Sequence, residues 1–319
     1  MKHLKTLTHL IVILSIMLLG TIACNDENSL TLPEGEITTD QAALEKIVDE
    51  DEAIESFEPN YNEDQAMSFV LGKTTSEIFP VRVGQKMRLV EKNLNVVFEG
   101  DTAYGTLTKT FDGVLFIVAS SDSITGNLDS LDLNVYEKSF TTTVTRKIIF
   151  VKKDNTNNPL NNWKISAVSL AEGGTLTDNI AIKSMTIFLP NGESINIEEP
   201  NEYFLSRGPS LRRAIPILSK FETVTIQVEL QSVYSDKDFV TLTYGALKSN
   251  KMKRAKKRFT LKREEFDGTY YNRLYEADWR IHSSRGFRHA IVNVYPYQVI
   301  KDSDAPVESN SWGMPYVVK

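Results

Sequence analysis

The chain has 319 residues, of which 41% are hydrophobic and 24% are charged, and this is the composition of an ordinary globular protein. A single cysteine excludes an intramolecular disulfide, but 319 residues are enough for two cores of about 150 residues each that need none. The net charge of −6 is unevenly distributed, because residues 25–64 hold fourteen acids and one base whereas residues 65–319 hold 33 bases and 28 acids. An acidic stalk joined to a mildly basic body suits a spacer near a membrane better than a nucleic-acid binder.

The first 24 residues follow the order of a secretory signal peptide. Two lysines precede an apolar run from Leu10 to Leu19, and small or neutral residues then lead to Cys24. As a helix, the segment from Leu10 to Ala23 would reach roughly 21 Å, which is short of the ~30 Å hydrocarbon core of a bilayer. A permanent transmembrane helix is therefore the weaker interpretation.

A cysteine directly after such a segment resembles the lipobox of bacterial lipoproteins, in which the thiol is acylated and cleavage makes the cysteine the new N-terminus. Ala23 fits the position before the cysteine, whereas Thr21 stands where the family usually has leucine. The resemblance implies that residues 1–23 are removed, that Cys24 is the site of lipid attachment, and that the protein lies in the cell envelope on a bacterial membrane, the outer membrane in particular. The alternative is an ordinary signal peptide with an incidental cysteine.

Residues 24–36 are predicted to form the lipidated cysteine and a flexible tether, because they are polar and lack periodicity. A helix is expected next, with Thr38 or Thr39 as its N-cap and an apolar stripe that continues to Ile54. A second helical piece is expected at 63–71. The acid run at 49–52 is interpreted as a solvated helix face, since it lacks the alternating ligands and the glycine of a calcium loop.

Residues 37–173 are predicted to be a helix-led domain with an antiparallel sheet. Its strand candidates, separated by turn signals such as Asp112-Gly113, are Val83–Glu91, Leu94–Glu99, Ala103–Phe111, Val114–Ala119, Phe140–Lys152 and Asn162–Leu170. A helix before a curved sheet that ends in Trp-Lys-Ile resembles the nuclear-transport-factor-like (SnoaL-like) cone fold. The resemblance implies a pocket between helix and sheet, which some members use for catalysis and many for binding. This segment has no histidine, so no acid or base residue can be chosen in it.

The sequence Ala171-Glu172-Gly173-Gly174 breaks the strand pattern and is taken as the domain boundary. Residues 178–319 are predicted to be all β, with a hairpin at Pro190-Asn191-Gly192 and a helical insertion at Ser210–Leu218. The strand candidates are Ile182–Leu189, Glu193–Glu198, Thr223–Val233, Phe239–Tyr244, Arg258–Arg263, Tyr270–Glu276, Trp279–His282, His289–Val294 and Tyr316–Val318. Short strands at this spacing resemble an immunoglobulin-like sandwich, without the Cys–Trp–Cys pattern of antibody domains. The predicted fold class is mainly β: an α+β N-terminal module followed by an all-β sandwich.

Few residues suggest chemistry. After the leader the only histidines are His282, expected to be solvated beside Arg280, and His289. The basic run from Lys248 to Arg263 is interpreted as a hairpin tip and a soluble edge strand rather than a phosphate-binding surface. Residues 266–319 hold ten aromatics, expected to be mainly structural with Trp279 and Trp312 buried: Phe266, Tyr270, Tyr271, Tyr275, Trp279, Phe287, Tyr295, Tyr297, Trp312 and Tyr316.

The sequence therefore predicts a membrane-anchored lipoprotein with a non-enzymatic binding or structural role. The membrane is its expected partner through the lipid, a protein or a glycan is a further one, and no nucleic acid, cofactor or metal is expected. No catalytic residue and no ligand-binding residue can be named. One alternative is a small-ligand carrier or enzyme that uses the pocket of the N-terminal module, and another is a cell-surface carbohydrate-binding protein.

Overall fold

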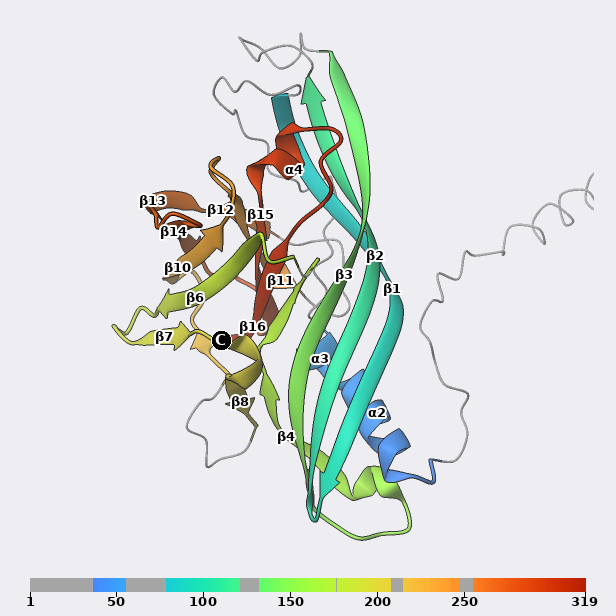
Figure 1. Cartoon of the computed structure of the whole chain (residues 1–319). Helices are drawn as coiled ribbons and strands as arrows, with labels where there is room; N and C mark the ends of the chain where they lie inside the picture. The colour runs from blue at the N-terminus through green and yellow to red at the C-terminus, as the bar shows by residue number, and fades with distance from the viewer. Residues whose placement is uncertain (1–36, 56–78, 121–131, 176, 208–214, 247–254) are drawn as a thin grey trace, which may run out of the picture. The chain divides into compact units, whose positions relative to one another are not determined.

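The computed structural model describes residues 37–55, 79–120, 132–175, 177–207, 215–246 and 255–319 (Figure 1). These residues form a mainly β structure with two sheets in which nearly all pairs are antiparallel, which confirms the prediction that the protein is mainly β. The predicted leader, Cys24, the tether and the helical piece at 63–71 lie outside the described residues.

Two short helices open the described chain, α2 (Asp40–Glu50) and α3 (Glu52–Glu55). The hydroxyl of Thr39 accepts a backbone N–H of the first turn at 3.2 Å, so the predicted N-cap is confirmed. The helix stops where Asp51 takes up an extended conformation. Ile54 therefore lies on α3 rather than on a continuation of α2.

Three long strands follow, β1 (Phe79–Glu99), β2 (Thr102–Ser120) and β3 (Leu133–Lys152), which lie side by side (Figure 1). The predicted turn at Asp112-Gly113 was wrong, because β2 runs through it without a break. Gly113 lies opposite Phe140 on β3, and a Cβ at Gly113 would be 2.4 Å from an atom of that ring. The glycine is needed to make room for the ring and not to turn the chain.

The larger sheet has eleven strands, with a main order of β1-β2-β3-β5-β16-β15-β11-β12 and with β4, β8 and β9 on branches. Its other strands are β4 (Trp163–Ser169), β5 (Ala171–Gly174), β8 (Phe204–Ser206), β9 (Ile217–Leu218), β11 (Phe239–Ala246), β12 (Ala255–Arg258), β15 (Gly286–Tyr295) and β16 (Asn310–Val318). Two expectations change here. The segment expected to break the pattern is strand β5, which pairs with both β3 and β16, and the end of the predicted helical insertion is strand β9, which is parallel to β16.

The smaller sheet has five strands in the order β13-β14-β10-β6-β7. They are β6 (Ile180–Phe188), β7 (Ser194–Ile197), β10 (Thr223–Ser232), β13 (Thr260–Phe266) and β14 (Tyr271–Arg280). The predicted hairpin between β6 and β7 is confirmed, with Gly192 at a positive φ of 86°. One helical turn and two 3-10 segments complete the assignment: α4 (Tyr297–Lys301), η3 (Pro159–Asn161) and η4 (Pro200–Glu202).

The chain changes sheet twice within predicted β regions. It leaves β10 in the smaller sheet and enters β11 in the larger one, so these strands are not hairpin partners. It returns at Phe259, between β12 and β13, and the single strand predicted at 258–263 was therefore wrong. Phe259 is buried and its N–H donates to Val240 O at 3.0 Å, which fixes the crossing point.

The hydrophobic core occupies both faces of the strands β11, β15 and β16. On one face, residues such as Val292 and Tyr316 share a core with Ile226 and Val228 of the smaller sheet. On the other face, Ile291 and Tyr295 pack against residues of the long strands β1–β3. The larger sheet therefore curls until residues from its two ends meet, and α2 packs inside that curve through Leu44 and Val48.

Candidate functional site

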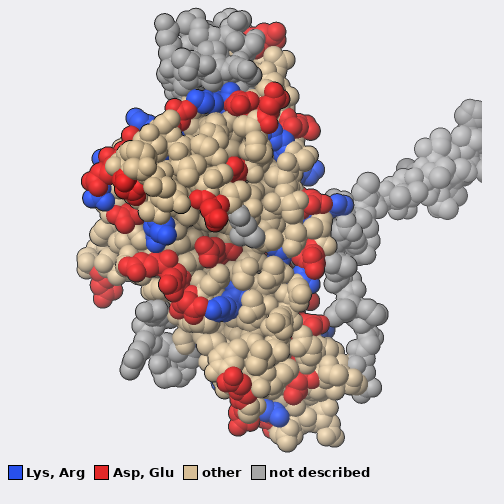
Figure 2. All heavy atoms as spheres, in the orientation of Figure 1, with Lys and Arg blue, Asp and Glu red and all other residues tan. Residues whose placement is uncertain are grey.

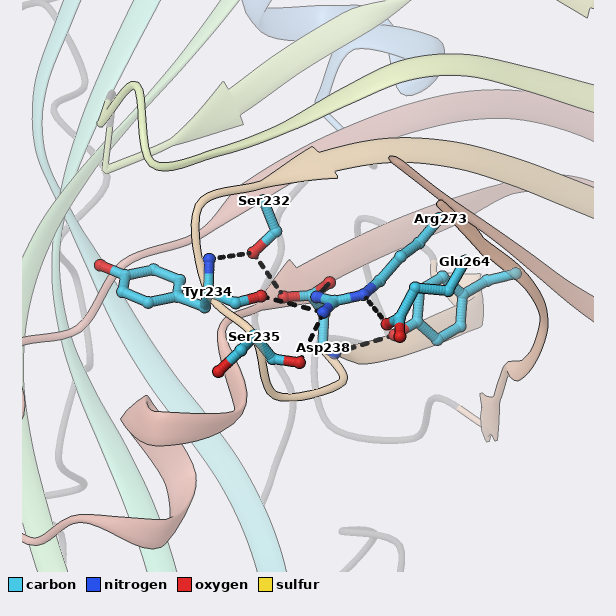
Figure 3. Close-up of polar contacts among 7 residues, drawn as sticks. Ser232, Tyr234, Ser235, Asp238, Glu264 and Arg273 are labelled. Carbon is cyan, nitrogen blue, oxygen red and sulfur yellow. Dashed lines mark hydrogen bonds and ion pairs between the residues drawn. The ribbon is translucent and has the colours of Figure 1, made fainter. Parts of the chain in front are cut away.

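Arg273 lies at the centre of the best-defined polar cluster, which holds the chain where it passes from β10 to β11 (Figure 3). Its side chain has an exposed fraction of 0%. The Nη1 atom donates to Asp238 Oδ2 at 2.7 Å and the Nε atom donates to Glu264 Oε2 at 2.6 Å. The Nη2 atom donates to the backbone carbonyls of Tyr234 and Ser235, each at 2.9 Å.

Further bonds complete this cluster. Asp238 accepts from the hydroxyl of Ser232 at 3.0 Å, and its own N–H donates to the Tyr275 hydroxyl at 2.8 Å. Burial raises the pKa of Asp238 to about 6, although the attraction of Arg273 opposes the shift. Arg273 directs its donors to protein groups, so the arrangement fastens the crossover and is not shaped to receive a substrate.

A second cluster lies where α3 meets the inner face of β1 and β2. Glu55 Oε1 accepts from Lys109 Nζ at 2.8 Å and from Lys92 Nζ at 3.2 Å. Lys92 also pairs with Asp49 of α2. Burial would raise the pKa of Glu55, but the two ammonium groups outweigh it and the pKa is lowered. The carboxylate therefore stays ionised and ties the helices to the sheet.

Arg146 lies one strand further into the sheet, with an exposed fraction of 2%. It donates to the carbonyl of Ala53 at 2.7 Å, and its Nη2 is 3.2 Å from His289 Nε2. Burial lowers the pKa of Arg146 to about 10, so it remains a cation at neutral pH. His289 comes from β15, so the structure brings a histidine into the helix-led module, whose own sequence has none.

A third group consists of neutral side chains on the same inner face. Thr241 and Thr243 of β11 and Asn293 of β15 have exposed fractions of 0–2%, and Thr241 lies directly opposite Asn293. Among the residues that the structure describes, the two threonine hydroxyls and the asparagine Nδ2 have no hydrogen-bond partner. Burying such atoms without a partner costs about 1–3 kcal/mol each. The three residues lie at neighbouring positions of the paired strands β11 and β15.

The structure places most of the predicted residues outside these clusters. Cys24 lies beyond the described residues. His282 is only partly buried, and its Nε2 lies 3.2 Å from the Tyr316 hydroxyl, so it is not simply solvated as predicted. Burial, with Arg288 nearby, lowers the pKa of His282 and keeps it neutral at physiological pH.

The part of the basic run that the structure describes supports the edge-strand interpretation. It includes β13, which is an edge strand of the smaller sheet. There Lys262 pairs with Glu276 at 3.0 Å and Arg263 pairs with Glu229 at 3.3 Å. On the face shown in Figure 2, acidic side chains are more prominent and basic ones lie singly among them.

The aromatic residues near the C-terminus are mainly structural, as predicted. Trp279 is 0% exposed and Trp312 is 2% exposed. The ring of Trp279 packs edge-on against Tyr316 with centroids 4.8 Å apart, and against Tyr244 at 5.6 Å. Of the ten aromatics, Phe266 alone has an exposed side chain, at 57%. A row of exposed rings, which the carbohydrate-binding alternative requires, is not formed by these ten residues.

The alternation of buried and exposed residues along β2 and β3 marks the buried charges in the sequence. Lys109 alternates in phase with Leu107 and Phe111, and Arg146 alternates in phase with Val144 and Ile148. A charged residue in the buried phase of an alternating strand must be paired inside the protein. The partners themselves, which come from α3 and β15, could not be read from the strands.

No family model matches the chain, and no curated protein matches it. Within the described ranges, no helix is long and apolar enough to cross a membrane. Among the same residues, no group of three or more His, Cys, Asp or Glu side chains could hold a metal ion.

Proposed function

We propose that this protein is an exported lipoprotein, anchored in the bacterial cell envelope through Cys24, with a non-enzymatic binding or structural role. The observation that carries the proposal is the order of residues 1–24: a basic start, an apolar run too short to span a bilayer as a helix, and the only cysteine of the chain directly after it. The polar stretch from Asn25 to Glu36 then serves as the tether. The outer membrane is the proposed location.

The body of the protein is consistent with such a role. Residues from Ile37 to Lys319 form one compact unit. Its two most extensive charge clusters are used to fasten a crossover and to tie two helices to a sheet, which are structural uses. We further propose that α2 on the inner face of β1–β3 corresponds to the cone fold, and that the smaller sheet packed on β11, β15 and β16 corresponds to the immunoglobulin-like sandwich.

The anchor is tested by replacing the acylated atom. In cells fed a labelled fatty acid, Cys24→Ser should abolish labelling and leave the protein as a precursor that is not normally cleaved, because no other thiol is present. Thr21→Leu is the matched control, since it brings the segment closer to the lipoprotein pattern and should keep full labelling. Normal labelling of the Cys24→Ser protein would rule out the anchor.

A small-ligand carrier is the second candidate, and one observation favours it. The unsatisfied atoms of Thr241, Thr243 and Asn293 all lie on the inner face of the curled sheet, beside apolar residues such as Ile291. A few polar groups on a mostly apolar concave surface are typical of a ligand site. A ligand with hydrogen-bond acceptors would satisfy these groups.

The carrier is tested by what the protein retains during purification. Protein purified without denaturation should release a small molecule into organic solvent, detected by mass spectrometry, and the double variant Thr241→Val/Asn293→Leu should lose it. Thr225→Val is the control, because its hydroxyl bonds to Asp278 on the outer face of the smaller sheet. If Thr241→Val instead raises stability by about 1 kcal/mol and nothing is released from the wild type, the hydroxyl serves no ligand and the carrier fails.

A further inference from the structure

Large apolar and aromatic side chains stay exposed beside the turn that joins β1 to β2. Val97 has an exposed fraction of 55%, and Phe98 and Tyr104 have exposed fractions of 44% each. All three lie within three residues of the turn at Gly100-Asp101. Within the described part of the chain, no other turn has three such side chains beside it. Exposed apolar side chains gathered in one place indicate a surface that contacts another molecule or a membrane.

These side chains project from both faces of the hairpin. Val97 lies directly opposite Tyr104, and Tyr104 lies opposite Ile149 of β3, so the three form a row on the outer face. Phe98 follows Val97 and therefore points to the inner face, where its ring meets Trp163 edge-on with centroids 5.7 Å apart. The end of the hairpin, which we call the β1–β2 tip, is thus apolar on both sides.

The charges around the β1–β2 tip balance one another. Three acids and three bases surround it: Glu99, Asp101, Asp154, Lys152, Lys153 and Lys164. The N–H of Lys152 donates to Asp101 O at 2.8 Å, and its ammonium lies 5.9 Å from the centre of the Trp163 ring. Lysines in such positions can lay their methylene chains along apolar surface and keep their ammonium groups in water. Binding at this tip therefore depends on apolar contact and not on a net charge.

The β1–β2 tip lies at the end of the body where the tether joins it. Figure 1 shows α2 beginning at the same end of the three long strands as this turn and η3. Close to the start of α2, the Gln41 amide donates to the carbonyl of Leu94 at 3.1 Å, near the end of β1. Twelve residues separate Cys24 from Ile37, and they reach about 40 Å at most.

We propose that the β1–β2 tip inserts into the surface of the membrane that holds Cys24, with Val97, Phe98 and Tyr104 as the inserted side chains. The inference rests on the proposed lipid anchor, because three side chains are too few to hold a protein on a membrane by themselves. A short tether raises the local concentration of membrane at the tip to about the millimolar range, at which a weak contact forms.

The geometry of the tip favours a bilayer over a protein surface. A protein surface can cover the outer row or the ring of Phe98, but a bilayer surrounds both faces of an inserted hairpin. The residue types also fit the depth of such a contact, since a tyrosine suits the level of the headgroups and valine and phenylalanine suit the acyl chains. The balanced charges leave the contact independent of anionic lipids.

Vesicles that carry the protein through its cysteine test this contact. Residues 24–319 are coupled through Cys24, the only thiol of the chain, to maleimide-bearing lipids in phosphatidylcholine vesicles. Hydrogen exchange followed by mass spectrometry should show the turn at Gly100-Asp101 exchanging about tenfold more slowly on vesicles than in the free protein. The turn at Asp267-Gly268 of the smaller sheet serves as the internal reference and should exchange equally in both. Adding phosphatidylglycerol to the vesicles should leave the slowing unchanged.

A matched pair of variants identifies the inserted side chains. The triple variant Val97→Ser/Phe98→Ser/Tyr104→Ser should lose the slower exchange on vesicles. Phe266→Ser should keep it, because Phe266 is also an exposed ring beside a hairpin turn, 57% exposed and stacked on Tyr271 with centroids 4.7 Å apart, but belongs to the smaller sheet. Melting temperatures of both variants check that they are folded.

The wild-type measurement decides the proposal even if the triple variant does not fold. Equal exchange of the turn on vesicles and in solution would overturn the membrane contact. Slower exchange that appears without vesicles as the protein concentration rises would also overturn it, because a second copy would then cover the tip. The coupling does not depend on acylation in cells, so labelling of the Cys24→Ser protein decides the anchor separately.

Discussion

Arg273 illustrates how a single residue can hold two sheets together. It belongs to β14 of the smaller sheet, yet three of its bonds reach the segment that enters the larger one, at Tyr234, Ser235 and Asp238. The guanidinium also lies over the ring of Tyr271, with its carbon 4.8 Å from the ring centre. The residue thus replaces the hydrogen bonds to water that the crossover carbonyls lose on burial.

We expect Arg273→Met to lower the free energy of unfolding by about 3–5 kcal/mol, because it leaves Asp238 and two carbonyls buried without their partner. Urea denaturation measures this. Arg263→Met is the control, since that side chain is 58% exposed beside Glu229 and should cost less than about 1 kcal/mol. Adding Asp238→Leu to Arg273→Met should recover part of the loss. Equal effects of the two arginine variants would show that the buried cluster does not fasten the crossover.

At the scale of one element, β2 continues through Gly113, which makes room for the Phe140 ring on β3 and does not form a turn. We expect Gly113→Ala to destabilise the protein by about 1–3 kcal/mol, because its Cβ would overlap the Phe140 ring on β3. Phe140→Leu in the same chain should reduce that cost by giving the methyl group room. Urea denaturation of the single and double variants checks this. A fully additive pair would mean that the ring and the glycine do not interact.

Elements with a local signal could be predicted, and elements defined by distant partners could not. The Thr39 cap, the Asn191-Gly192 hairpin and the strand character of β3 and β10 follow from neighbouring residues. The sequence of β5 is typical of a segment that interrupts a strand, since it ends in two glycines. It is a strand because β3 and β16 approach it from both sides, and a Cβ at Gly173 would lie 2.5 Å from Thr143 O.

The switch from β12 to β13 escaped prediction for a related reason. Residues 258–263 have continuous strand propensity, and only the position of two different partner strands shows that they divide at Phe259. The polar sites follow the same rule. Alternation could have identified Lys109, Arg146 and Arg273 as buried charges, but Glu55, His289 and Asp238 lie at least 35 residues away from their cations and depend on the topology.

For the whole molecule, the division into 37–173 and 178–319 stays a prediction, and the structure makes its test sharper. We expect each fragment to unfold cooperatively when it is expressed alone. Each should be less stable than the intact chain, because the pairing between β5 and β16 would be lost. Thermal unfolding followed by circular dichroism measures this. Mixing the fragments should raise both melting temperatures. Fragments without any cooperative transition would show that the division is wrong.

The position of β16 has a consequence for the order in which the chain can fold. It is the last strand along the described chain, yet it lies in the middle of the larger sheet, between β5 and β15. While the chain is being synthesised from its N-terminus, β5 and β15 therefore lack their shared neighbour, and the gap between them stays open until residues 310–318 emerge. Closing that gap joins residues such as Gly173 and Ser311, and contacts so distant in sequence form slowly. A premature stop before residue 310 would therefore remove a central strand and not an edge strand. It would divide the larger sheet into two parts, and the newly exposed strands β5 and β15 would be prone to pair with other chains.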